Sequence, residues 1–118
     1  MNTGTRESIQ GTDETDLSPT AIFGLLADDR RRRALRYLSR TAGGTDLDDL
    51  AAELALREGD ASDRRRDRIR ASLFHTHLPK LRDAGVVRYD PERGTVERPP
   101  GRDPFEPYLA LAAADEAR

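Results

Sequence analysis

The sequence has no cysteine and only one lysine, Lys80, among its 118 residues. Without cysteine, disulfides, thiolate metal sites and cysteine nucleophiles are all excluded. The longest apolar runs are only a few residues, too short to cross a bilayer as a helix. The first ten residues show no apolar core flanked by basic residues, which argues against a secretory signal. These absences predict a cytoplasmic protein without a membrane segment.

Motifs of the common enzyme classes are also missing. There is no glycine-rich phosphate loop, no G-x-S-x-G, and only two histidines, His75 and His77. On a helix, two residues this close in sequence point about 200° away from each other and cannot bind one ion. We therefore expect no enzyme, no metal site and no cofactor. His77 is expected to be a hydrogen-bonded core residue, and His75 to lie on the surface.

Charge, in contrast, is abundant. Charged residues make up 36 % of the chain, and nineteen of the twenty basic residues are arginine, whose planar donor fork suits phosphate. The net charge of −2 conceals segregation, because residues 1–18 carry −3 whereas residues 28–40 and 57–88 each carry +4. Residues 45–56 hold four acids and no base. This alternation permits a basic face on an acidic protein.

Composition divides the chain into three parts. Residues 1–16, rich in Thr, Gly, Ser and acids, predict a disordered acidic arm. Residues 17–98 predict one domain, which begins where Ser18 can cap a helix that has Pro19 in its first position. Residues 99–118 open with Pro-Pro-Gly and predict a linker and a C-terminal helix that begins at Pro107.

Within residues 17–98 the pattern predicts four helices and a hairpin. The second helix is expected from Asp28 to about Thr41, and the third from Thr45, which forms a capping box with Asp48. A fourth helix is expected over 63–84, closed by Gly85 and followed by strands within 86–90 and 95–98. The expected fold is mainly α (α+β): a winged helix-turn-helix with a two-stranded hairpin wing (86–98) and a C-terminal helix.

The fourth helix carries the candidate binding residues. Its apolar half contains Ile69, Leu73, Phe74, Leu78, Leu81 and Ala84, and its other half is polar. Guanidinium, hydroxyl and imidazole groups can bond phosphates or base edges in a major groove. A solvated arginine face without a partner is the alternative, and the hairpin that follows favours DNA. The candidate contacts on the helix and the hairpin are Arg64, Arg65, Arg66, Arg68, Ser72, His75, Arg82, Arg88 and Arg93.

Two features leave alternatives open. Pro79 removes a backbone donor and should bend the fourth helix or begin a new segment, either to set the entry into a groove or as a tolerated kink. The apolar side of the terminal helix is too small for the helix to fold alone. It can pack on a second copy, giving a two-fold dimer, or on its own domain. We favour dimerisation, through Phe105, Tyr108, Leu109, Leu111 and Ala112.

Two segments resemble ArsR-type winged-helix regulators: LADDRRRRALRYL (26–38) and HTHLPKLRDAGVV (75–87). The form HTHLPKL is most similar to a haloarchaeal group of winged-helix proteins of unknown function. The resemblance covers about residues 17–98 and implies a dimeric, DNA-binding transcriptional regulator, with His75 and Thr76 near base edges. The cysteine motif of the metal-responsive branch is missing, so metal sensing is not implied.

We therefore expect a sequence-specific regulator of double-stranded DNA with a recognition helix over 63–84. It would act as a homodimer, and the sequence gives no indication of a small-molecule effector. The alternative is a winged-helix module that binds protein and not DNA, which the acids of the third helix and the negative net charge favour.

Overall fold

The computed structural model describes residues 17–41, 43–99 and 105–116, with the side chains of the last segment described up to Ala112. The helices are α2 (Pro19–Leu26), α3 (Asp29–Arg40), α4 (Leu47–Arg57), α5 (Asp63–Ser72), α6 (Leu78–Asp83) and α7 (Glu106–Glu116). A π-helical turn, η2 (Leu73–His77), joins α5 to α6. The strands are β1 (Thr45–Asp46), β2 (Arg88–Asp90) and β3 (Thr95–Glu97). The described part is therefore mainly helical with a small antiparallel sheet, in agreement with the expected α+β class.

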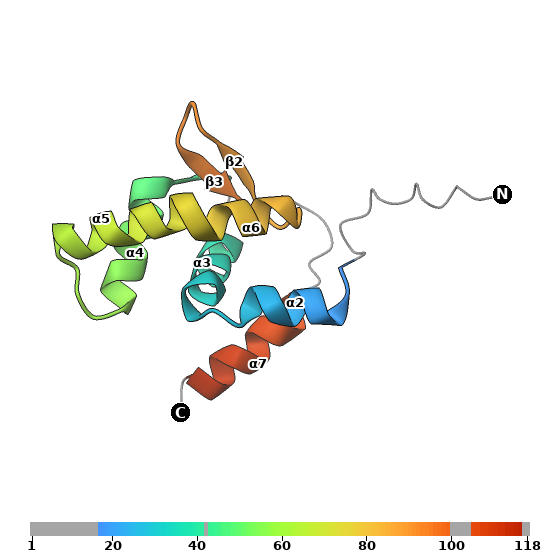
Figure 1. Ribbon diagram of the computed structural model, residues 1–118. Coiled ribbons are helices and arrows are strands. Elements are labelled where there is room, and N and C mark those ends of the chain that lie inside the picture. Colours follow the sequence, from blue (N-terminus) through green and yellow to red (C-terminus); the bar gives the residue numbers. More distant parts are fainter. Residues whose placement is uncertain (1–16, 42, 100–104, 117–118) are drawn as a thin grey trace.

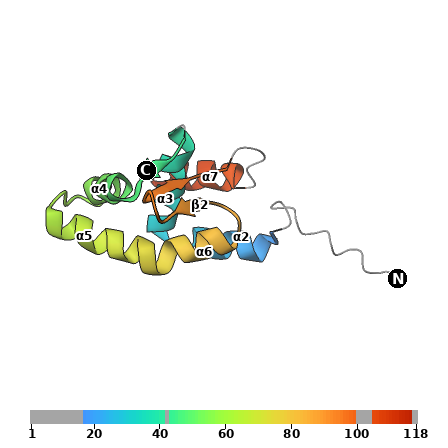
Figure 2. The same cartoon turned by 90° about the horizontal axis from the view of Figure 1, so that it is seen from above.

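The helices α5 and α6, joined by η2, form one long rod along one side of the molecule (Figure 1). Seen from above, α3, α4 and α7 lie behind this rod (Figure 2). The β2–β3 hairpin rises beside α6 and projects away from the helices (Figure 1). The rod thus has one long side that faces away from the other helices, with the hairpin next to it.

Side-chain caps begin three of the helices where the sequence predicts. Ser18 Oγ accepts a hydrogen bond from the Ala21 N–H at 3.1 Å, ahead of Pro19 in the first turn of α2. Asp28 Oδ1 accepts from the Arg31 N–H at 3.0 Å, and Ser62 Oγ from the Arg65 N–H at 3.1 Å. Each cap satisfies a backbone donor that the first helical turn leaves without a partner.

The predicted start of the third helix at Thr45 is wrong, whereas the predicted hairpin is present as β2 and β3 and gains a third strand. Thr45 and Asp46 form β1, which pairs antiparallel with β3 to give a three-stranded sheet of order β1-β3-β2. The helix begins at Leu47, and its cap is Asp46, whose Oδ1 accepts from the Asp48 N–H at 2.7 Å. The partner of β1 lies about fifty residues further along the chain, so no local pattern indicates this strand.

One hydrophobic core joins the helices to the sheet. Leu35, Leu50, Ile69, Leu81 and Val96 are completely buried and come from α3, α4, α5, α6 and β3 respectively. Each such side chain contributes about 1.5–3 kcal/mol by leaving water. The rod is therefore fixed against α3 and α4 along its inner side.

Candidate nucleic-acid interface

The rod owes its shape to Pro79. A regular helix would bring the proline ring against the carbonyl of His75 and would leave that carbonyl without a donor. The chain instead widens into the π-helical turn η2, in which the Leu78 N–H bonds to the Leu73 carbonyl five residues earlier. The helix α6 then starts at Leu78, and Gly85, with φ 76°, lies directly after it. The expected continuous helix over 63–84 is thus three segments, with a new one near Pro79 as predicted.

The outer side of the rod carries a polar stripe. Arg64, Arg68, Ala71 and His75 are spaced three or four residues apart and are all exposed. This spacing places them on one face of a helix. Within the described part of the chain, Arg64 and Arg68 form no ion pair, so their guanidinium groups are available to an outside partner. We call these four residues the outer stripe.

Three more predicted contact residues lie elsewhere on the rod. Thr76 and Arg82 are exposed, and Ser72 is half-buried at the end of α5. Arg82 forms no ion pair with other residues that the structure describes. It lies in α6, the helix of the rod that contacts β2 of the hairpin.

Arg65 was predicted to contact DNA, but it does not lie on the outer stripe. Its guanidinium is 3.2 Å from Glu58 Oε1 and 3.7 Å from Asp60 Oδ2, both in the connection between α4 and α5. Arg66 is likewise engaged by acids of its own helix, at 3.5 Å from Asp63 and 3.4 Å from Asp67. The sequence could not show this, because the periodicity of a helix does not indicate which acids a folded connection brings beside it.

Glu58 ties α5 to α3. Its carboxylate accepts two hydrogen bonds from Arg30 of α3, at 2.8 and 2.9 Å, and one from Arg65 of α5 at 3.2 Å. Arg30 holds the pKa of Glu58 below its ordinary value of 4.5, and Arg65 adds to this effect. The carboxylate therefore stays charged at neutral pH and fixes the N-terminal half of the rod.

The hairpin carries two exposed arginines. Arg88 on β2 pairs across the strands with Glu97 at 2.9 Å, and Arg93, in the turn, lies 3.8 Å from Asp90. Both pairs are solvent-exposed, and such pairs hold their partners by less than about 1 kcal/mol. Both arginines can therefore exchange these acids for phosphate at little cost.

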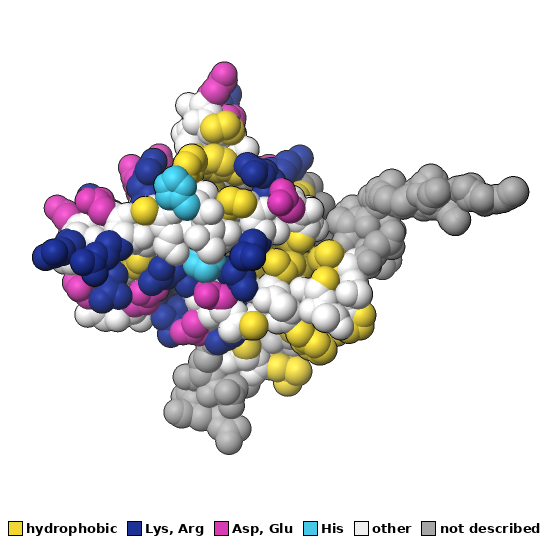
Figure 3. Space-filling view, viewed as in Figure 1, with side chains coloured by type: hydrophobic (Ala, Val, Ile, Leu, Met, Phe, Trp, Pro, Cys, Tyr) yellow, Lys and Arg dark blue, Asp and Glu magenta, His cyan; other side chains and the backbone are white. Residues whose placement is uncertain are grey.

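Aromatic side chains join the rod to the hairpin. The rings of Phe74 and Tyr89 lie 6.2 Å apart in an edge-to-face arrangement, and the ring of Phe74 lies 4.9 Å from that of His75. Phe74 is 44 % exposed, so its predicted place in the apolar half of the helix is wrong. Phe74 lies at the surface against Tyr89, whereas His77, in the same turn, is buried as predicted. In Figure 3, apolar side chains gather at the foot of the hairpin, and basic and acidic groups alternate over α5.

A model of one protein family matches residues 23–97, and the family is described as a domain of unknown function (DUF7344). The chain belongs to the DUF7344 family. No curated protein and no solved structure matches the chain. The DUF7344 match begins in α2 and ends at the last residue of β3, so it includes the rod, the outer stripe and the hairpin. In the part of the chain that the structure describes, no helix has the length and apolar character needed to cross a membrane.

A buried polar network supports the DUF7344 domain from beneath the rod. His77 is buried as predicted, and its Nδ1 lies 3.3 Å from a terminal nitrogen of Arg31. A guanidinium can only donate, so Nδ1 accepts and the imidazole is neutral. Burial lowers the pKa of His77 below its ordinary value of 6.5, against the opposing charge of Asp28.

Sequence reasoning missed the role of Arg31. Its other nitrogens donate to the carbonyls of Leu25 and Gly24, at 2.7 and 3.1 Å, in the last turn of α2. Arg31 thus caps the C-terminus of one helix and holds His77 of the rod. It is one of four consecutive arginines, and nothing local distinguishes it from the other three.

The helix α7 lies outside the DUF7344 match and packs on its own domain. Phe105 is 1 % exposed and Leu109 is also buried in the core, so both are unavailable to a second copy, contrary to our preference. Tyr108 is half-buried, with its ring 5.3 Å from that of Phe23 on α2. Of the predicted dimerisation residues, Ala112 is half-buried and Leu111 is 71 % exposed.

Proposed function

We propose that this DUF7344 protein is a sequence-specific regulator of transcription that binds double-stranded DNA as a winged helix-turn-helix protein, and that it is not an enzyme. In this proposal α4 and α5 form the helix-turn-helix, the rod is the recognition helix, and the β2–β3 hairpin is the wing. The observation that carries it is the outer stripe of Arg64, Arg68, Ala71 and His75, which faces away from the core beside a hairpin with two exposed arginines.

The chemistry of these residues fits the two kinds of contact that DNA recognition needs. Arg64 and Arg68 lie in the first turns of α5, where a helix N-terminus also attracts phosphate. His75 can donate to or accept from a base edge in the major groove, and Ala71 leaves room for the thymine methyl group. Arg88 and Arg93 of the wing are suited to a flanking phosphate or to the minor groove.

The test is a binding measurement with DNA fragments selected from the source genome by the full chain, followed by fluorescence anisotropy at several salt concentrations. Arg68→Ala should weaken binding to all sequences and reduce the slope of log K against log salt by about 1. His75→Ala should cost about 1–3 kcal/mol and relax the preference for particular bases. Arg40→Ala, an exposed arginine on α3, provides the matched control. An equal loss of DNA affinity in all three variants, or no DNA binding at any salt concentration, would contradict the proposal.

We also propose that the regulator is a homodimer through the outer faces of α2 and α7. Phe23 and Leu111, 56 % and 71 % exposed, are among the large hydrophobic side chains left at the surface. A two-fold dimer would match a palindromic operator. Leu111→Glu should turn a dimer into a monomer in light scattering, and a wild-type monomer at high micromolar concentration would refute this part.

One observation favours the alternative of a protein-binding module. Several arginines of α5 are already engaged by acids, including Arg70, which pairs with Asp48 at the exposed start of α4. The acids of α4 would repel a DNA backbone close to them. Co-purification of one stoichiometric protein partner without enriched DNA would decide for this alternative.

A further inference from the structure

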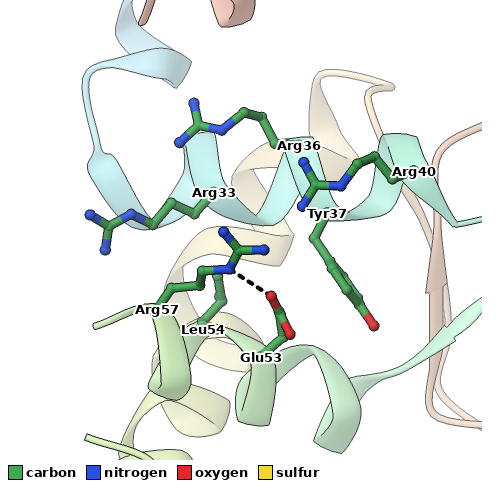
Figure 4. A pocket seen from close by; sticks show the side chains of 7 residues that line it. All are labelled: Arg33, Arg36, Tyr37, Arg40, Glu53, Leu54 and Arg57. Atoms are coloured by element: carbon green, nitrogen blue, oxygen red, sulfur yellow. Dashed lines mark hydrogen bonds and ion pairs between the residues drawn. The ribbon is translucent and has the colours of Figure 1, made fainter. Parts of the chain in front are cut away.

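A second basic surface lies on the other side of the molecule, between α3 and α4. A cavity of about 70 Å³ opens there, and four arginines line it: Arg33, Arg36 and Arg40 from α3, and Arg57 from α4. Tyr37 and Glu53 complete its polar lining. Figure 4 shows these side chains gathered along the two helices, with the ribbon of α5 behind them, so this arginine pocket faces away from the rod.

Four arginines and one acid line the arginine pocket, and the acid, Glu53, pairs with Arg57 at 2.7 Å. Arg36 has an interaction partner of its own, so the excess of positive charge in the pocket comes from Arg33, Arg40 and Arg57. Asp29, one turn before Arg33, lies 3.3 Å from that arginine and is itself shared with Arg32. Arg40 is exposed and forms no ion pair with the residues that the structure describes. In a chain with a net charge of −2, this accumulation of positive charge is local.

We propose that the arginine pocket binds a small phosphate-bearing anion. Guanidinium groups match the oxygens of phosphate with paired donors, and several of them together favour an anion with more than one negative charge over a single carboxylate. A cavity of about 70 Å³ is several times the roughly 10–15 Å³ that one water molecule needs, so it has room for a small anion. Tyr37 also lines the cavity.

The position of the pocket separates it from the proposed DNA interface. The outer stripe belongs to α5 and η2, whereas all the pocket residues belong to α3 and α4. Bound anion would stand between the two helices and neutralise arginines of both. The arginine pocket is therefore a separate site for a small ligand, and DNA bound to the rod would not cover it.

Isothermal titration of the full chain at low ionic strength tests this, with inorganic phosphate, pyrophosphate and adenosine monophosphate as probes. Binding by at least one probe is expected, with pyrophosphate tighter than phosphate because it carries more charge. Adenosine monophosphate tighter than phosphate would identify a nucleotide as the source of the phosphate group. Arg40→Ala should weaken binding about tenfold or more, through the loss of a charge-assisted contact. Glu53→Gln should strengthen it, because the competing carboxylate is gone.

Lys80→Ala is the matched control, since it removes one exposed positive charge on α6. It should leave the affinity for the anion within about twofold, because the lysine lies outside the pocket. An equal loss in Lys80→Ala and Arg40→Ala, or no binding of any probe, would overturn the proposal. A loss of DNA affinity in Arg40→Ala without anion binding would also overturn it, by assigning these arginines to a DNA surface. Failure of the outer-stripe variants to affect DNA would count against the DNA proposal alone.

Discussion

Replacing Glu58 by Gln keeps the shape of the side chain at the junction of α3, α4 and α5 but removes its charge. The carboxylate is 14 % exposed and accepts three hydrogen bonds from two arginines. A glutamine retains one acceptor oxygen and turns an NH₂ group toward a guanidinium that can only donate. The loss of at least one charge-assisted hydrogen bond at this half-enclosed site should cost about 2–3 kcal/mol. For a domain of this size, Tm should fall by roughly 8–15 °C.

Glu53→Gln provides the matched control for stability. Glu53 pairs with Arg57 four residues later at 2.7 Å, but this arginine is largely exposed. An exposed pair of this kind contributes about 0.5 kcal/mol or less. Thermal and urea unfolding of the three proteins should therefore separate Glu58→Gln clearly from the other two. Similarly small losses of stability in Glu58→Gln and Glu53→Gln would refute the argument that Glu58 holds the rod to α3.

The same comparison at low pH adds a second test. Since the pKa of Glu58 is depressed in the folded protein, its stabilisation is present above the unfolded value of 4.5. It is lost as the pH falls through the lower, folded value. The difference in unfolding free energy between wild type and Glu58→Gln should therefore shrink in acid. If this difference in unfolding free energy stayed constant as the pH fell below 4.5 and through the folded pKa of Glu58, the charge of the carboxylate would not be its cause.

Other substitutions test other parts of the structure. Because the pKa of His77 is depressed, the stability of the wild type should begin to fall as the pH drops below 6.5. His77→Gln should remove this part of the dependence of stability on pH. The same pH dependence in the variant would contradict a buried neutral imidazole. Gly94→Ala should destabilise by about 1–2 kcal/mol because φ is +69° there. Gly24→Ala, in a helix with open space around it, should stabilise the protein by about 0.5–1 kcal/mol. If chemical unfolding showed that both glycine substitutions change stability in the same direction, the difference in backbone φ between the two sites would not explain their effects. Phe105→Ala should cost about 3–5 kcal/mol if α7 packs as described, whereas Leu111→Ala should leave monomer stability unchanged.

Local chemistry was sufficient to predict several helix ends. Ser18 caps the first helix as expected, two more helices begin next to Asp28 and Ser62 near their predicted starts, and the helical spacing ends where Gly85 takes a left-handed φ. The burial of His77 also followed from periodicity. These features depend on neighbours within one or two helical turns, which the sequence displays directly.

Features that depend on distant segments could not be predicted in the same way. A strand of two residues has no periodicity, so β1 becomes visible only when β3 is placed beside it. The exposure of Phe74 depends on a π-helical turn, and although Pro79 signals a disturbance, it does not specify how the helix absorbs it. The engagement of Arg65 by Glu58 depends on the folded path of the connection between α4 and α5.

The central position of β3 determines where the hairpin can change in length. Thr95 and Val96 pair with β1 on one side and β2 on the other, and the Leu47 N–H bonds to the Gly94 carbonyl at 2.8 Å. A one-residue slip of β3 would turn Val96 from the core to solvent, so an insertion within the strand cannot be accommodated. Residues 91–93 of the turn are exposed, and extra residues there would lengthen the tip without moving its base. The hairpin can therefore vary in reach while its direction relative to α4 stays fixed.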